Sequence, residues 1–182
     1  MDREPDISAL WAEAERFPDK IYPVDKWTPA LCGEMDVLIR KDGTWLHEGR
    51  PIERSEIVRL FAKLLRYEDG AYFLVTPVEK LRITVEDLPF RIVDRDGLTF
   101  ISDQGARLPL GEAHPLMIDV IGDEWLPRLR VRGDLWARMT RAETYRLFDA
   151  AQIETGEGCV WLTLEGQRVD VPLCEGENLC GL

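Results

Sequence analysis

Residues 35–47 read MDVLIRKDGTWLH, and this stretch decides the fold class that the sequence predicts. Apolar side chains stand at alternate positions from Met35 to Ile39, which is the period of a half-buried β-strand. The pair Asp42-Gly43 is typical of a tight turn, and Thr44–His47 supplies the return strand. The sequence therefore predicts a β-hairpin in this region.

A helix is predicted after this hairpin, over Arg54–Tyr67. Its apolar side chains form one broad stripe at helical spacing, consisting of Ile57, Val58, Leu60, Phe61, Leu64 and Leu65. Glu68-Asp69-Gly70 is expected to end the helix, and strands are expected at Tyr72–Thr76 and over residues 81–85. The order of elements is then hairpin, helix, hairpin.

The rest of the chain is dominated by strand patterns. Residues 90–101 predict a hairpin around Arg95-Asp96-Gly97. Weaker strands at Arg107–Leu110 and Leu116–Val120 contain or follow Pro109 and Pro115, which favours places at sheet edges. Further predicted elements are a strand pair over 129–139, a helix from the capping box Thr140-Arg141-Ala142-Glu143 to about Gln152, and a hairpin over 159–173.

The second predicted helix matches the first at a constant offset of 87 residues. The identical pairs are Arg54/Arg141, Glu56/Glu143, Arg59/Arg146, Leu60/Leu147 and Phe61/Phe148. Both copies have the same order of elements, which favours an internal duplication and predicts that the matched pairs Leu60/Leu147 and Phe61/Phe148 are buried. The sequence thus predicts an α+β fold of two related small domains, each built on a hairpin–helix–hairpin unit.

The predicted domain boundaries follow from this pattern. Residues 1–34 form an N-terminal helix, over 6–17, and an extended segment. The first domain covers 35–88, and the second covers 89–182 with its repeat unit at 126–173.

Composition excludes several classes of protein. Of 182 residues, 45% are hydrophobic and 31% charged, which excludes a disordered or collagen-like chain. The net charge of −11 repels phosphate backbones and anionic lipids, so neither a nucleic acid nor a membrane is expected as a partner. The N-terminus lacks a basic and apolar leader pattern, so we expect a soluble, cytoplasmic protein.

Cysteine and histidine spacing does not indicate a metal site. Cys32, Cys159, Cys174 and Cys180 lie far apart, and neither His47 nor His114 adjoins a cysteine. Structural zinc sites usually take their ligands in close pairs. We expect four free thiols, with Cys159 buried in an apolar run and Cys174 and Cys180 in a polar tail that could oxidise.

Several motifs resemble the domain of unknown function 1285 family of bacterial proteins. They are RKDGTWLHEGRPI at 40–52, LVTPVEK at 74–80, VEDLPF at 85–90, His114-Pro115-Leu116 and the segment 132–141. The resemblance covers residues 20 to 173. It implies an α+β fold of two related domains, the second superficially pleckstrin-homology-like, and a small, nucleotide-like ligand at the domain interface in a signalling context. No activity comes with the family, so it supplies no catalytic residues.

If such an interface pocket exists, its walls should come from the corner after Tyr72–Thr76 and from facing parts of the second domain. The candidate ligand-binding residues are Thr76, Pro77, Glu79, Lys80, His114, Arg132, Arg138 and Arg141. One lysine and three arginines in one cleft would select small anions. The alternative interpretations are a surface ion pair at Glu79-Lys80 and a solvated arginine face formed by Arg128, Arg130 and Arg132.

The leading hypothesis is therefore a regulatory protein that binds a small anionic, nucleotide-like ligand. A protein–protein adaptor is the first alternative, and an enzyme that uses His47, Glu79 or His114 is the second. His47-Glu48 could form an acid–base pair, but adjacent strand residues point to opposite faces. Nucleotide-binding loops, nucleophile elbows and zinc-protease motifs are absent, and the sequence identifies no cofactor.

Overall fold

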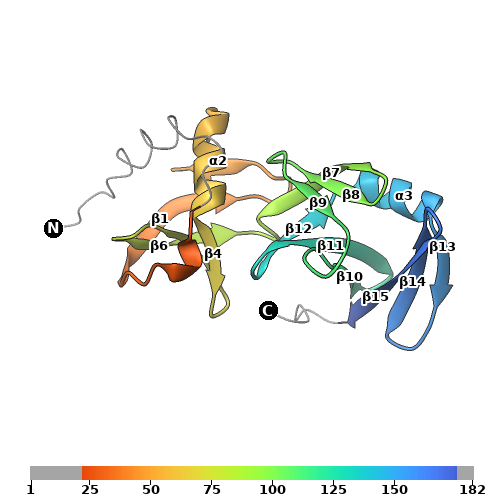
Figure 1. Cartoon of the computed structure of the whole chain (residues 1–182). Coiled ribbons are helices and arrows are strands. Elements are labelled where there is room, and N and C mark those ends of the chain that lie inside the picture. Colours follow the sequence, from red (N-terminus) through yellow and green to blue (C-terminus); the bar gives the residue numbers. More distant parts are fainter. Residues whose placement is uncertain (1–21, 176–182) are drawn as a thin grey trace. The chain divides into compact units, whose positions relative to one another are not determined.

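The computed structural model describes residues 22–175, and the chain divides into two compact units. Unit 1 ends at Glu86 and unit 2 begins at Asp87 (Figure 1). Strands account for 53% of the described residues and helices for 15%. The protein is mostly β, so the predicted α+β class is wrong. The helix predicted over residues 6–17 lies outside the described residues.

Unit 1 is built on one mixed sheet with the order β3-β2-β1-β6-β5-β4. Its elements are η1 (Val24–Lys26), β1 (Leu31–Ile39), β2 (Trp45–His47), β3 (Arg50–Pro51), α2 (Ser55–Leu64), β4 (Leu65–Glu68), β5 (Ala71–Val75) and β6 (Lys80–Val85). The central strands β1 and β6 run parallel, and the outer pairs are antiparallel. Helix α2 crosses from one outer strand to the other and buries Leu60, Phe61 and Leu64 (Figure 1).

The helix in unit 1 is shorter than its apolar stripe predicts. It ends at Leu64, and Leu65–Glu68 continues as strand β4. Asp69 and Gly70 both have positive φ, of 50° and 77°, and join Glu68 to Ala71 in a two-residue turn. Such a turn matches the twist of a hairpin. Residues 65–67, which also fit the helical spacing, therefore form a strand of this hairpin instead of a last helical turn.

Unit 2 contains a larger mixed sheet with the order β13-β14-β15-β10-β11-β12-β7-β8-β9. Its elements are β7 (Phe90–Asp96), β8 (Thr99–Ser102), β9 (Arg107–Pro109), β10 (Leu116–Ile121), β11 (Glu124–Arg132), β12 (Leu135–Met139), α3 (Arg141–Ala150), β13 (Gln152–Thr155), β14 (Cys159–Leu164) and β15 (Gln167–Glu175). Strand β9 lies at one edge, as Pro109 predicts. Strand β10 lies inside the sheet, because Pro115 precedes the strand and interrupts none of its pairs.

The hairpin–helix–hairpin unit is also a wrong description. In each unit, three antiparallel strands precede the helix and three follow it, and the first strand pairs in parallel with the last. Unit 2 adds β7, β8 and β9 beside β12. The pleckstrin-homology-like expectation is not met either, because the second unit is a nine-stranded mixed sheet whose helix lies between β12 and β13.

The start of α3 keeps only half of the predicted capping box. The Thr140 side chain accepts a hydrogen bond from the Glu143 N–H at 3.4 Å. The Thr140 N–H instead donates to the Ile92 carbonyl, so it does not need the Glu143 carboxylate. That carboxylate is buried and pairs with Arg95 at 3.2 Å, which attaches α3 to the β7–β8 hairpin.

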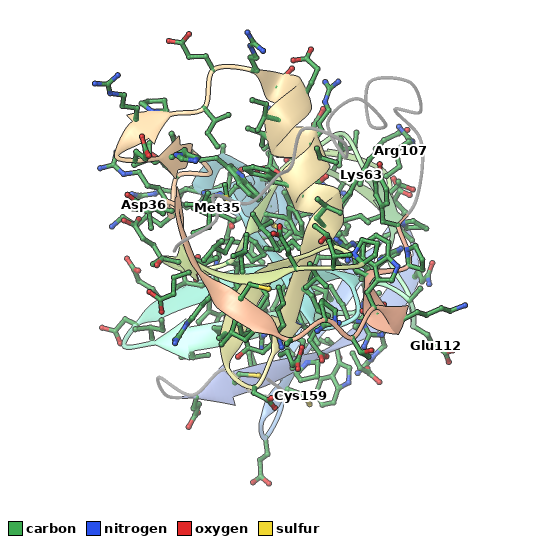
Figure 2. All side chains as sticks on the ribbon, turned by 90° about the vertical axis from the view of Figure 1, so that its left-hand side faces the viewer. Met35, Asp36, Lys63, Arg107, Glu112 and Cys159 are labelled. Atoms are coloured by element: carbon green, nitrogen blue, oxygen red, sulfur yellow. The ribbon has the colours of Figure 1, made fainter. Side chains whose placement is uncertain are left out.

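The two helices bury their matched phenylalanines to different extents. Phe61 is 2% exposed and contacts Trp45, with ring centroids 6.5 Å apart. Phe148 is only half-buried, although the sequence predicts burial for both. Figure 2 shows α2 with its side chains, and Lys63 is labelled on that helix. The difference leaves apolar surface uncovered on α3.

We predict unequal costs for truncating these two side chains. Phe61→Ala should destabilise unit 1 by about 3–5 kcal/mol, as removal of a fully buried ring does. Phe148→Ala should cost unit 2 less, because its ring is only half-buried. Denaturant unfolding of both variants measures this. Equal losses would contradict the difference in burial.

Candidate functional site

The candidate residues of unit 1 form a tight corner between β5 and β6. The Thr76 hydroxyl accepts hydrogen bonds from the N–H groups of Glu79 and Val78, at 2.9 and 3.3 Å. The Thr76 N–H donates to the Glu79 carbonyl at 2.8 Å. Pro77 is exposed at the tip. Thr76 is buried, and its hydroxyl and N–H groups form hydrogen bonds with the backbone of the turn.

Lys80 takes part in an ion cluster on the same sheet. Its ammonium lies 2.8 Å from the Glu68 carboxylate, which also pairs with Arg66. The hydrogen bond from Lys80 holds the pKa of Glu68 below its usual value. The ammonium also lies 4.3 Å from the centroid of the Phe73 ring. These contacts join β4, β5 and β6, and they pair the charge of Lys80 with that of Glu68.

Arg138 in unit 2 belongs to a buried chain of alternating charges. It donates to both carboxylate oxygens of Asp87, at 2.8 and 2.9 Å, and to Asp119 at 2.8 Å. Asp119 in turn lies 3.0 Å from Arg128, which is fully buried over the Trp136 ring. The expectation of a solvated face is therefore wrong for Arg128. The two positive charges of the arginines balance the two negative charges of the aspartates. This network of ion pairs therefore joins the strands without leaving a net charge.

The other three candidates of unit 2 lie on different elements. His114 lies in the loop before β10, where its Nδ1 is 2.9 Å from the Arg130 carbonyl. Arg132 is half-buried at the end of β11. The remaining candidate, Arg141, is the first residue of α3 and is exposed.

Arg141 lines a concavity of about 650 Å³ within unit 2. Three groups of side chains surround it: aromatic, charged, and small or apolar. In chain order they are Arg91, Asp123, Glu124, Trp125, Leu126, Met139, Arg141, Thr144, Tyr145 and Phe148. The residues come from β7, the β10–β11 turn, β11, the end of β12 and one face of α3. Arg141 is the one sequence candidate among them.

Aromatic rings form much of this concavity. Trp125 and Phe148 meet edge to face, with centroids 5.9 Å apart and planes at 72°. Tyr145 is 62% exposed, an unusual position for a large ring. The Arg141 guanidinium lies 5.6 Å from the Tyr145 centroid and donates to its hydroxyl at 3.2 Å. A planar ring could therefore stack beside a fixed positive charge.

The charges around the concavity are mixed. The hydrogen bond to Tyr145 raises the pKa of Arg141, and the Glu124 carboxylate adds a smaller effect in the same direction. Arg91 supplies a second positive charge close to Asp103. Burial raises the pKa of the Asp103 carboxyl, and a hydrogen bond from the Arg91 backbone opposes this. The concavity is thus lined by two arginines, Arg91 and Arg141, and by the carboxylates of Asp123 and Glu124.

Sequence reasoning missed Trp125, Tyr145 and Phe148. Trp125 belongs to a strand that the sequence predicts only from Leu129 onward, because Pro127 interrupts the pattern. Phe148 was assigned to the core by its match to Phe61. The useful signal was the weak apolar face of this helix, on which Tyr145 and Phe148 stand three positions apart.

Thiols and metal ligands add no second candidate. Cys174 is buried in β15, against its predicted place in a polar tail, and Cys159 is only partly buried. Cys32, Cys159 and Cys174 are free, while Cys180 lies outside the described residues. Within residues 22–175, no group of three or more His, Cys, Asp or Glu side chains is placed to hold a metal ion. In that same range, no helix is long and apolar enough to span a membrane.

We predict that the buried charge chain is required for the stability of unit 2. Asp119→Asn removes the carboxylate that pairs with both Arg128 and Arg138, which should cost about 3–5 kcal/mol. The matched control is Asp96→Asn, because Asp96 pairs with Arg107 at a similar distance, 2.9 Å, but on the surface. Its loss should stay below about 1 kcal/mol. Denaturant unfolding compares the two, and similar losses would contradict the assignment.

Comparison with known proteins assigns the chain to a family. Residues 22–88 match the N-terminal domain of DUF1285, a domain of unknown function, and residues 91–173 match the C-terminal domain of the same family. A solved DUF1285 family protein from Silicibacter pomeroyi DSS-3 shares 36% identity, with a TM-score of 0.73 over 86% of this chain and 88% of that one.

A second solved DUF1285 family protein, from Shewanella baltica OS155, is 28% identical. Its TM-score is 0.52, over 63% of this chain and 91% of that one. No protein with a curated description matches the chain. The two matched domains together cover most of the sequence, in the order in which its motifs occur, and the chain belongs to the DUF1285 family.

Proposed function

We propose that this protein is a regulatory protein that binds a small anionic ligand with an aromatic ring, of the kind that a nucleotide provides. The proposed site is the concavity of unit 2. The observation that carries the proposal is the exposed pair of Arg141 and Tyr145 beside the Trp125–Phe148 ring pair. A guanidinium favours phosphate or carboxylate, and the rings favour a planar group.

The size and shape of the concavity support a small ligand. Its volume of about 650 Å³ falls within the range of about 300–1,000 Å³ that is typical of small-molecule sites. Met139 is buried and Leu126 half-buried, so the lining combines apolar surface with the polar groups of Arg141 and Thr144. Such a combination orients a ligand through few polar contacts.

The net charge of the whole chain favours a small anion over a polyanion. The charge of −11 repels a nucleic acid along its length, whereas two arginines act on a small anion at short range. We therefore expect single nucleotides or similar aromatic anions to bind, and long nucleic acids not to bind. The nearby carboxylates Asp123 and Glu124 should limit the affinity of purely anionic compounds.

We predict that Arg141 is needed for binding. In a thermal-shift screen of nucleoside monophosphates, a compound that stabilises the protein should bind at least about tenfold more weakly to Arg141→Gln, because a charge-assisted hydrogen bond is lost. Arg168→Gln is the matched control, since Arg168 also lies over an aromatic ring, Trp161 at 4.9 Å, but outside the concavity. That variant should bind as the wild type does.

Two outcomes would contradict the proposed function. One is that no aromatic anion raises the melting temperature, while a macromolecular partner does, which would favour a protein–protein adaptor. The other is a thermal shift that Arg141→Gln leaves unchanged, which would place the ligand elsewhere. Inorganic phosphate serves as a control for nonspecific anion binding, and it should stabilise the protein less than a nucleoside monophosphate.

A further inference from the structure

Strand edges of the described residues differ in how well they resist pairing with another chain. An open edge presents free N–H and C=O groups to any extended segment. Strand β3 is two residues long and contains Pro51, and β9 contains Pro109. On β4, the Arg66 guanidinium donates to the carbonyls of Val24 and Trp27, so the η1 segment lies against that strand. These three edges are each blocked by proline or by covering chain.

The edge strand β13 has no such protection. Its four residues, Gln152–Thr155, are all exposed and include no proline, glycine or lysine. It pairs with β14 on one side and ends the sheet on the other. Figure 1 shows β13 as the outermost strand of unit 2, beside β14. Among the edges that the structure describes, this one is suited to accept a further strand.

Ile153 indicates that the core of unit 2 reaches this edge. It stands opposite Leu162 of β14, which is fully buried, and so lies on the core side of the sheet. Yet Ile153 itself is 41% exposed, because no strand lies beyond it. A strand added at this edge would cover Ile153 and extend the apolar face by one position.

We propose that β13 pairs in antiparallel register with β13 of a second copy of this chain, about a two-fold axis at Ile153. Two-fold pairing across one continuous sheet keeps each side chain on its own face, so residues of the same parity meet. An axis at Ile153 places it opposite the partner's Ile153. It also places Gln152 opposite the partner's Glu154, twice by symmetry.

Charge selects this register over its neighbour. An axis at Glu154 would place two carboxylates directly opposite each other, which destabilises a strand pair. With the axis at Ile153, each carboxylate meets an amide that can donate to it. Glu154 also lies 3.2 Å from Arg168 of its own chain, so the local charge is balanced in a protein that is otherwise acidic. These features favour a second copy as the occupant of the edge.

The contact is short, so the dimer should be weak and reversible. Four residues a side bury far less than the about 1,200–2,000 Å² of a stable interface. Sedimentation equilibrium of the full chain, from about 10 μM to about 1 mM, should therefore show a concentration-dependent monomer–dimer equilibrium. A chain that stays monomeric throughout that range would overturn the proposal, even if some other protein were found to pair with β13.

Two variants test the place of contact. Ile153→Lys should raise the dimer dissociation constant at least about tenfold, because it sets two ammonium groups side by side. Val78→Lys is the matched control, since Val78 is an apolar residue that is 78% exposed on the β5–β6 corner. It should leave the dissociation constant unchanged. A dimer that survives Ile153→Lys with the native circular dichroism spectrum would overturn the proposal.

A pair of substitutions tests the register. Gln152→Lys should tighten the dimer a few-fold, because two lysines then face the partner's Glu154, and Gln152→Glu should weaken it. If both substitutions act in the same direction, the axis does not lie at Ile153. All of these measurements are made without ligand, so their failure would leave the proposed concavity untouched.

Discussion

A buried carboxylate, Asp119, is the constraint on which unit 2 depends. It is only 2% exposed, and its two oxygens pair with Arg128 on one side and Arg138 on the other. Arg138 reaches further, to Asp87 at the start of the unit and to the Leu126 carbonyl at 2.8 Å. One guanidinium thereby joins β10, β11, β12 and the segment before β7. Removal of any member would leave a charge buried without its full set of partners.

The concavity adjoins this arrangement. Leu126, whose carbonyl Arg138 holds, lines it, and so does Met139, the residue that follows Arg138 along β12. The helix that forms another wall is held separately, since the buried Glu143 pairs with Arg95 of β7. Rigid polar contacts on two sides thus leave the rings of Tyr145 and Phe148 uncovered between them.

Sequence patterns predicted most strands, because alternation and turn residues are local signals. The hairpin at Asp42-Gly43 forms with Gly43 at a φ of 90°, and the strand over 81–85 appears as β6. Residues with two competing local signals were harder to assign. Residues 65–67 fit the helical stripe, but the turn at Asp69-Gly70 places them in β4. The predicted class was wrong because each helix is a single element beside a sheet of six or nine strands.

The candidate site was harder to predict from the sequence than the fold. Period two placed Arg128, Arg130 and Arg132 on one face. Nothing local reveals that Asp119, which stands opposite Leu126 on the neighbouring strand, pairs diagonally with Arg128. Arg138 is engaged in the same way. Arg141 was chosen for its charge and does line the concavity, whereas the rings beside it come from a strand and a helix far apart in sequence. Contacts between distant segments decide such positions, and a single sequence carries little trace of them.

The most direct test of the account is a two-dimensional ¹H–¹⁵N NMR titration of the full chain with a nucleoside monophosphate, with inorganic phosphate as the reference. The account predicts that the Trp125 indole N–H and the backbone amides of residues 141–148 shift together and saturate with the monophosphate. Phosphate alone should leave the indole signal in place, because it brings no ring. Shifts confined to other parts of the chain, or no saturable shift at Trp125, would contradict the assignment of the concavity as the ligand site.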